Sequence, residues 1–236
     1  IYVAGGTEGG LDGNTNAGDY DGFIVKYDSA GIKQWTRQFG TVNYDKANGF
    51  SVDATGNLYV AGHTSGGLDG NANAGGSDGF LVKYDSSGTK EWTKQFGTAS
   101  GDEASDVSVD VNGNIYVAGD TSGGLDANVN VGSSDGFLVK YDSSGVKQWT
   151  KQFGTASGDA AYGVATDGNG NVYVTGSTQG GLEGNTSAGS QDGFLVKYDS
   201  SGVKQWTRQF GTASYDWTND VSVDVNGNIY VAGGTE

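Results

Sequence analysis

The sequence contains no cysteine, no proline and no methionine, and its 236 residues include a single histidine. Without cysteine, disulfides and thiolate metal sites are excluded, and glycine, asparagine, aspartate and serine must form the turns. Positive charge is also scarce, because 13 Lys and Arg stand against 28 Asp and Glu, which gives a net charge of −15. This balance argues against binding to nucleic acid or to an anionic membrane surface.

Long hydrophobic runs are missing as well. No apolar stretch approaches the roughly 20 residues that span a bilayer, so we expect no membrane insertion, and no signal peptide is visible. Because residue 1 is isoleucine, we expect the chain to be a processed or excised piece of a longer protein. With 35% hydrophobic and 11% aromatic residues, the chain has enough apolar side chains for a sizeable core.

Repetition is what the sequence has in abundance. The octapeptide IYVAGGTE stands at residues 1–8 and at 229–236, and variants of it begin at residues 58, 115 and 172, a period of 57. Four repeats, 1–57, 58–114, 115–171 and 172–228, are thus followed by an overlapping segment, 229–236. A strict period of this length predicts a repeat architecture, which we expect to form a single domain, 1–236.

Each repeat contains four short runs rich in Val, Tyr, Phe and Thr, which predict β-strands. One such set is formed by residues 49–53, 58–64, 79–85 and 90–96, termed strands A, B, C and D. The A–B and C–D connections have the composition of tight hairpin turns, and the B–C and D–A connections are longer. The short turns should share one edge of an up-and-down sheet, and the long loops the other. We predict an all-β fold, a β-propeller of four-stranded antiparallel blades, with a β-solenoid as the alternative.

Two segments carry a family resemblance. Residues 167–178, DGNGNVYVTGST, and 191–199, QDGFLVKYD, resemble the SBBP-type bacterial β-propeller repeat, and the resemblance covers all four repeats. It implies a bacterial module that is secreted or exposed at the cell surface. It implies no shared catalytic site.

The two copies of the octapeptide compete for one place. A strand A at residues 217–224 would close a four-bladed ring against the first repeat, which lacks its own strand A, but residues 229–235 claim the same position. Three arrangements stay open. Residues 229–236 are surplus and disordered, the array continues in a longer chain, or chains self-associate through their terminal strands in a larger or oligomeric propeller.

The longest loop predicts a cation site. Asp12, Asn14 and Asn16 place oxygen-bearing side chains at alternate positions, and the carboxylate of Asp21 closes the loop, a spacing typical of calcium loops. The same residue types also form turns, so calcium and purely structural turns both stay open. The equivalent candidates are Asp69, Asn71, Asn73 and Asp78, then Asp126, Asn128, Asn130 and Asp135, and finally Glu183, Asn185, Ser187 and Asp192.

A second acidic residue precedes each strand A, at Asp45, Asp102, Asp159 and Asp216. It either completes a metal shell or caps backbone amides of the loop. Aromatic residues follow two patterns. A tryptophan in each strand D is expected to pack between blades, at Trp35, Trp92, Trp149 and Trp206. Tyr44, Tyr162, Tyr215 and Trp217 stand in or beside the long loops, where exposed rings would stack on sugars.

Catalysis has little support, because His63 is the only histidine and acidic residues occur in every loop. We therefore expect a non-enzymatic, extracellular or cell-surface structural or adhesive module that binds protein or glycan at its long-loop face. The alternative is a carbohydrate-binding, lectin-like propeller with one site per blade. A glycosidase-type enzyme is the less favoured third class.

Overall fold

The computed structural model describes all residues from 1 to 236. The chain packs as two compact units, residues 1–104 and residues 105–236, and the boundary falls within strand β8 (Asp102–Val109). The single domain expected for residues 1–236 stays a prediction.

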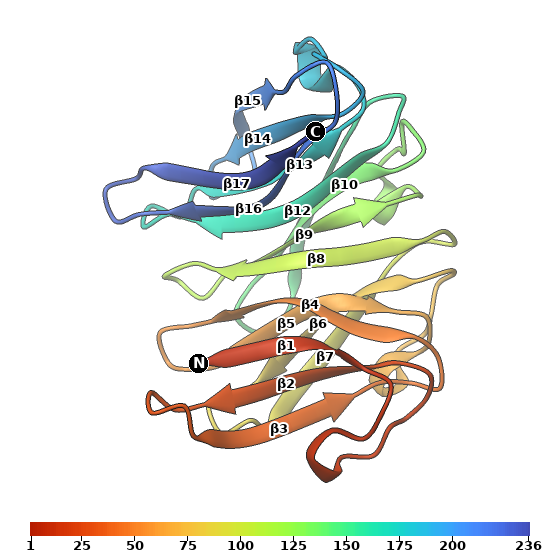
Figure 1. Ribbon diagram of the computed structural model, residues 1–236, viewed down its shortest axis with the longest axis vertical. Coiled ribbons are helices and arrows are strands. Elements are labelled where there is room, and N and C mark those ends of the chain that lie inside the picture. The colour runs from red at the N-terminus through yellow and green to blue at the C-terminus, as the bar shows by residue number, and fades with distance from the viewer. The chain divides into compact units, whose positions relative to one another are not determined.

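The first unit contains two antiparallel sheets and the first residues of β8 (Figure 1). The first sheet has the order β1-β2-β3 and the second the order β4-β5-β6-β7, so neighbours in sequence are neighbours in the sheet. The strands are β1 (Tyr2–Thr7), β2 (Asp21–Tyr27), β3 (Lys33–Phe39), β4 (Asp45–Val52), β5 (Leu58–Thr64), β6 (Asp78–Tyr84) and β7 (Lys90–Phe96).

The second unit repeats this arrangement in two four-stranded sheets, β8 to β11 and β12 to β15, followed by the pair β16-β17. Its further strands are β9 (Ile115–Thr121), β10 (Asp135–Tyr141), β11 (Lys147–Phe153), β12 (Asp159–Thr166), β13 (Val172–Thr178), β14 (Asp192–Tyr198), β15 (Lys204–Phe210), β16 (Asp216–Val223) and β17 (Ile229–Thr235). The predicted all-β propeller architecture of four-stranded antiparallel blades is confirmed. Residues 229–235 pair with β16, which contradicts one of the three open arrangements, the surplus and disordered segment.

Strand A begins earlier than the sequence pattern predicted, at Asp45 in β4 rather than at Gly49. A β-bulge separates Ala47 from Gly49 and leaves Asn48 as the extra residue; the same bulge occurs in β12 and β16. Because a bulge breaks the alternation of side chains, the pattern before Gly49 does not look like a strand. Each B–C loop also contains a short 3-10 helix that the sequence pattern did not predict. These helices are η1 (Leu11–Gly13), η2 (Leu68–Gly70), η3 (Leu125–Ala127) and η4 (Leu182–Gly184).

The expected division into two edges is confirmed. In each unit the short A–B and C–D turns lie on the left-hand side of Figure 1 and the long loops on the right. Asp53 shows why the turns are tight, because its Oδ1 accepts the backbone N–H groups of Thr55 and Asn57, both at 2.9 Å, while Gly56 takes a φ of 86°. We define the long-loop edge as the B–C loops (residues 8–20, 65–77, 122–134 and 179–191) and the D–A loops (residues 40–44, 97–101, 154–158 and 211–215), with the strand ends that adjoin them.

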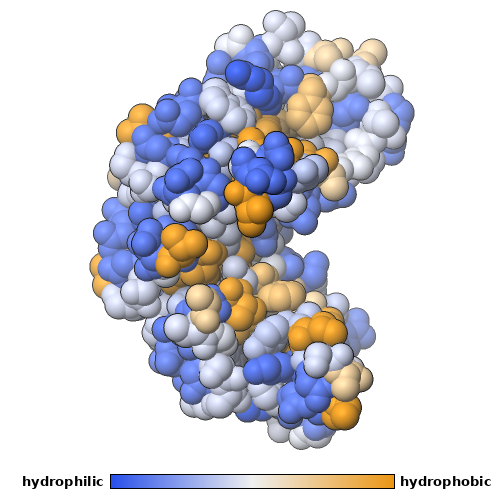
Figure 2. Space-filling model, turned by 90° about the vertical axis from the view of Figure 1, so that its left-hand side faces the viewer, coloured by the Kyte–Doolittle hydropathy of each residue, from blue (hydrophilic) through white to orange (hydrophobic).

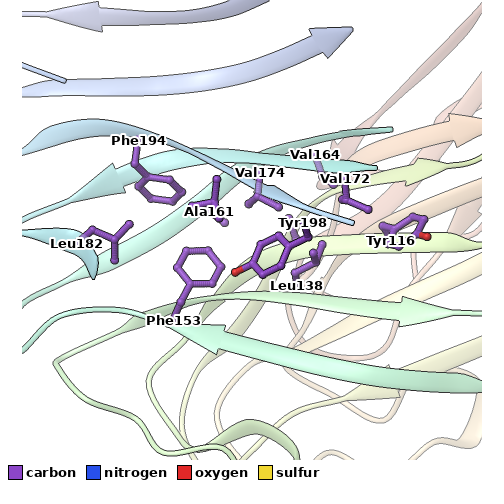
Figure 3. Close-up of a cluster of buried hydrophobic side chains, with 12 residues drawn as sticks. Tyr116, Leu138, Phe153, Ala161, Val164, Val172, Val174, Leu182, Phe194 and Tyr198 are labelled. Atoms are coloured by element: carbon purple, nitrogen blue, oxygen red, sulfur yellow. The ribbon is translucent and has the colours of Figure 1, made fainter. Parts of the chain in front are cut away.

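Apolar side chains of adjacent sheets interlock to form the core. In the second unit, Phe153 of β11 meets Phe194 of β14 edge-to-face at 5.7 Å, and Leu138, Val174 and Tyr198 pack around them (Figure 3). Trp149 lies against this cluster, and a Cβ on Gly202, in the C–D turn of the next sheet, would come within 2.9 Å of its ring. The expected packing of the strand D tryptophans between blades is therefore seen at Trp149.

The surface that carries the short turns is a mixture of polar and apolar side chains. Figure 2 looks onto this side and shows the apolar groups as small islands between polar ones. Exposed apolar residues of these turns are Ile32, Val111, Val146, Val203 and Val225. Single exposed residues of this kind are normal on a folded protein and mark no binding surface.

Candidate functional site at the long-loop edge

The carboxylate of Asp12 turns toward strand β3 rather than into its own loop. It forms an ion pair with Lys33, 2.5 Å from Nζ, and accepts a hydrogen bond from the Thr36 hydroxyl. Asp12 takes a φ of 53°, a left-handed conformation that aspartate tolerates better than most residues. The other repeats show the same arrangement, with Asp69 at Lys90 and Thr93, Asp126 at Lys147 and Thr150, and Glu183 at Lys204 and Thr207.

The asparagines of the loop use their amides as hydrogen-bond donors to the loop backbone. Nδ2 of Asn14 donates to the carbonyl of Leu11 at 2.7 Å, and Nδ2 of Asn16 donates to those of Glu8 and Gly18. Corresponding backbone contacts are made by Asn71, Asn73, Asn128, Asn130 and Asn185, and by the hydroxyl of Ser187. These side chains fasten the loop to itself, as turn-forming residues do.

A glutamine that the sequence pattern did not single out holds the loop to the sheet. Oε1 of Gln38, in β3, accepts the N–H of Leu11 at 2.8 Å, and its Nε2 donates to Gly9 O at 3.1 Å and to Asp21 Oδ2 at 2.8 Å. Gln95, Gln152 and Gln209 make the same three contacts. The signal was the unvarying Gln-Phe-Gly-Thr of strand D, which looks like ordinary strand sequence.

The predicted cation loop is therefore not assembled as the spacing suggested. Asp12 belongs to the Lys33 and Thr36 contacts and Asp21 to the Gln38 contact, and no group of three or more acidic or histidine side chains converges on one point. The same separation holds in all four loops. Asp21 lies instead beside the acidic residue that begins the next strand A, Asp45, and the two carboxylates flank Gly40.

The residues that differ most between repeats gather at the long-loop edge. The second residue of strand A is Lys46, Glu103, Ala160 and Trp217 in successive repeats, whereas the strand C sequence DGF(I/L)VKY scarcely changes. Its cross-strand neighbour changes with it, because Lys46 faces His63, Ala160 faces Ser177 and Trp217 faces Gly234. A Cβ on Gly234 would lie 2.5 Å from the Trp217 ring, so this glycine makes room for the tryptophan.

In the first unit this edge carries a stack of three rings. Tyr20 and Tyr44 lie parallel with centroids 4.8 Å apart, and Tyr44 and His63 lie 5.6 Å apart at an interplanar angle of 12°. Both faces of Tyr44 are thus covered, so it offers no platform for a sugar ring. The bulge residue Asn48 reaches the same place, with its amide nitrogen 3.1 Å from Nδ1 of His63.

The electrostatics of His63 keep it neutral. Burial lowers its pKa below the ordinary value of 6.5, the charge of Glu103 raises it, and the charge of Lys46 lowers it again. Nδ1 of His63 lies 3.8 Å from Oε2 of Glu103 and is closer to the Asn48 amide. The imidazole therefore sits in a packed stack beside the Asn48 amide.

In the second unit the equivalent positions carry smaller side chains and form an open pocket of about 120 Å³. The bulge residue Tyr162 lines it, with its hydroxyl 3.3 Å from Oγ of Ser177, which donates to it. The remaining lining residues are Ser134, Gly158, Asp159, Ala160, Gln179 and Gln191. Ser134, Gly158 and Ser177 stand two repeats after Tyr20, Tyr44 and His63, so one position is filled by rings in the first unit and open in the second.

The four aromatic residues expected to bind sugars are therefore not equivalent. Tyr44 is sandwiched, Tyr162 lines the pocket, and Tyr215 is 49% exposed. Trp217 lines a separate apolar hollow with Phe210 and Val231. The structure brings none of these four side chains together with another.

Repeated four-stranded antiparallel sheets, each with two tight hairpins at one edge, define a β-propeller repeat protein. The family model described as SBBP, beta-propeller repeat, matches residues 34–69, 91–126, 148–183 and 205–235, more than half of the chain. The chain belongs to this family. No helix in the structure has the length and apolarity to cross a bilayer.

Two curated proteins resemble the chain. It is 28% identical to the regulatory protein FlaEY of Caulobacter vibrioides over 273 residues, 100% of this chain and 28% of FlaEY. It is 26% identical to the uncharacterized WD repeat-containing protein L264 of Acanthamoeba polyphaga mimivirus over 181 residues, 60% of this chain and 13% of that protein. The chain thus spans less than a third of either relative.

Among solved structures, a gluconolactonase from Xanthomonas campestris superposes with a TM-score of 0.52 at 12% sequence identity, over 94% of this chain and 69% of that one. At this identity the likeness shows a shared fold and nothing about activity.

Proposed function

We propose that the protein is a non-enzymatic interaction module that binds a protein partner through its long-loop edge. One observation carries this proposal, namely that Lys46, Glu103, Ala160 and Trp217 differ in size and charge at one site of an otherwise constant repeat. The contacts of Gln38 and its equivalents hold the loops in one conformation, so residues at the edge vary without altering the scaffold. Variable side chains on a rigid support are how repeat proteins build binding surfaces.

The relatives support a role in interaction. One is named as a regulatory protein and another as a WD repeat-containing protein, and the proposal for this chain is that it serves the same general purpose. An extracellular or cell-surface location and an adhesive role are part of the proposal, supported by the solubility that a net charge of −15 confers. Self-association through β1, β16 and β17 is a separate proposal; sedimentation equilibrium showing monomers at all concentrations would contradict it.

Photo-crosslinking tests which surface meets the partner. A photoreactive residue in place of Ala160, at the long-loop edge, is compared with one in place of Val146, an exposed residue of a short turn in the same unit. We expect adducts with native cell extract from position 160 and not from position 146. Equal labelling at both positions, or labelling at 146 alone, contradicts the proposal.

A carbohydrate ligand is the second candidate, favoured by the pocket in the second unit. Tyr162, Gln179 and Gln191 supply a ring, a hydroxyl and two amides, the groups that recognise sugar hydroxyls. A glycan array probed with the wild type and with Tyr162→Ala tests this, with Trp217→Ala as the comparison at the other hollow. Binding that Tyr162→Ala abolishes supports a glycan site, and an array without signal removes it.

A further inference from the structure

Two rows of aspartates are buried at the ends of the strands that adjoin the long loops. Asp21 begins β2 and Asp45 begins β4, and both are fully inaccessible to solvent. The equivalent pairs are Asp78 with Asp102, Asp135 with Asp159, and Asp192 with Asp216. Buried carboxylates are rare unless a cation or several donors compensate them.

The two carboxylates of a pair lie beside the same glycine. The point where Gly40 would carry a Cβ lies 2.3 Å from Oδ1 of Asp21 and 3.1 Å from Oδ2 of Asp45. Gly97, Gly154 and Gly211 occupy the same place in the other pairs, with corresponding distances of 2.3 Å and 3.0–3.1 Å. No side chain of the glycine therefore separates the two acidic groups.

One oxygen of each carboxylate has a structural task. Oδ2 of Asp21 accepts the N–H of Ala17 and the amide of Gln38, both at 2.8 Å, which fixes the B–C loop. Oδ2 of Asp45 accepts the N–H of Thr41 at 2.6 Å and its hydroxyl at 2.9 Å, which fixes the D–A loop. Oδ2 of Asp135 and Oδ2 of Asp159 accept the corresponding hydrogen bonds from their own loops and from Gln152.

In six of the eight carboxylates the other oxygen is buried and has no hydrogen-bond partner. This holds for Oδ1 of Asp21, Asp45, Asp78, Asp135, Asp159 and Asp192. The hydroxyl of Thr178, which approaches Asp159, donates to Gly180 O at 3.2 Å instead. A buried carboxylate oxygen without a partner costs folding free energy and indicates a missing ion or water.

We propose that the pairs Asp21–Asp45 and Asp135–Asp159 each bind one calcium ion through their buried carboxylate oxygens. All available ligands are oxygens, which favours a hard cation, and two carboxylates balance a double positive charge. Backbone carbonyls of the two loops and water complete the shell of such an ion. The site is distinct from the alternate-position loop of Asp12, Asn14 and Asn16, and it does not depend on the proposed partner binding.

Charge supports the same conclusion. Asp135 and Asp159 are both buried and lie beside the same glycine, so each carboxylate disfavours the ionisation of the other. Without a cation, ionisation of both carboxylates of the pair is therefore unfavourable. A bound cation would remove this repulsion and tie the B–C loop of one sheet to the D–A loop that follows it.

Calcium titration of chelator-treated wild-type protein tests the proposal. Isothermal calorimetry should show two ions per chain, one for each of these two pairs, and calcium should raise the melting temperature. Absence of both heat and a melting shift at millimolar calcium overturns the proposal. Because this measurement uses the wild type, it decides the question even where a variant does not fold.

Two matched variants in the second unit locate the site. Asp159→Asn preserves the shape of the side chain and should lower the stoichiometry by one, whereas Asp126→Asn, in the predicted calcium loop, should leave it unchanged. The reverse result places the ion in the loop and overturns the proposal. If Asp159→Asn stabilises a protein that binds no calcium, the pair shares a proton instead, which also overturns it.

Discussion

Ala127 is the residue whose backbone conformation conflicts most directly with its side chain. It occupies the end of a 3-10 helix with a φ of 67°, in the left-handed region. The other three repeats carry glycine at this position, with φ values of 81° to 85°, at Gly13, Gly70 and Gly184. The repeats thus contain their own control for the cost of a Cβ.

The cost can be estimated from the backbone alone. A residue with a Cβ loses about 1–2 kcal/mol in the left-handed region, and glycine loses about 0.4–1 kcal/mol through the freedom of its unfolded chain. We therefore expect Ala127→Gly to raise the free energy of unfolding by about 0.5–1 kcal/mol. Gly70→Ala should lower it by about the same amount, because no atom lies within 4 Å of the added Cβ.

Urea denaturation followed by tryptophan fluorescence measures the change, and hydrogen exchange of the Asn128 amide, bonded to Leu125 O at 3.0 Å, reports on the turn itself. Gly168→Ala is the control, since Gly168 lies in an open turn, lacks a positive φ, and has alanine or valine as its counterparts. It should stabilise by about 0.4–1 kcal/mol, opposite in sign to Gly70→Ala. Stabilisation by Gly70→Ala, or destabilisation by Ala127→Gly, would refute the reasoning.

Two further predictions concern the fastening of the loops. Gln152→Ala removes three hydrogen bonds and leaves buried groups without partners, so it should lower the free energy of unfolding by about 2–4 kcal/mol. The control Gln148→Ala, on the exposed part of the same strand, should lower it by less than about 0.5 kcal/mol. Equal losses for the two variants in urea denaturation would contradict this prediction. The contacts of Lys33 and Thr36 hold the pKa of Asp12 below its ordinary value of 3.8. The resulting stability is present above pH 3.8 and is lost as the pH falls through the folded-state pKa of Asp12. In acid denaturation, the free energies of unfolding of wild type and Asp12→Asn should therefore converge as the pH falls. A difference that stays constant with pH would count against the ion pair.

Much of the fold followed from the repeat. Strands B and D, Leu58–Thr64 and Lys90–Phe96, have the predicted bounds, because their alternation is unbroken and tight turns flank them. Strand A was placed too late because a bulge at Asn48 interrupts the alternation on which the prediction depended. Pattern reasoning sees period two and cannot see one inserted residue.

The site was less predictable than the fold. Spacing correctly placed the acidic and aromatic residues at one edge, but it grouped Asp12 with Asp21 although their carboxylates serve Lys33 and Gln38. Sequence distance within a loop does not determine side-chain direction when the loop contains a residue with a positive φ, as at Asp12. Asp21 and Asp45 belong to two different sheets and both approach Gly40, so no pattern within one loop predicts that they lie close together.

The division between constant and variable residues allows the long-loop edge to differ between repeats while the loop backbone stays the same. Gln38 and Asp21 fix the loop backbone through contacts that do not involve the side chains at positions 46 and 63. A change there, from Lys46 and His63 to Ala160 and Ser177, exchanges a ring stack for a pocket while the cross-strand register is preserved. Under the proposed interaction role, neighbouring repeats therefore need not bind the same group.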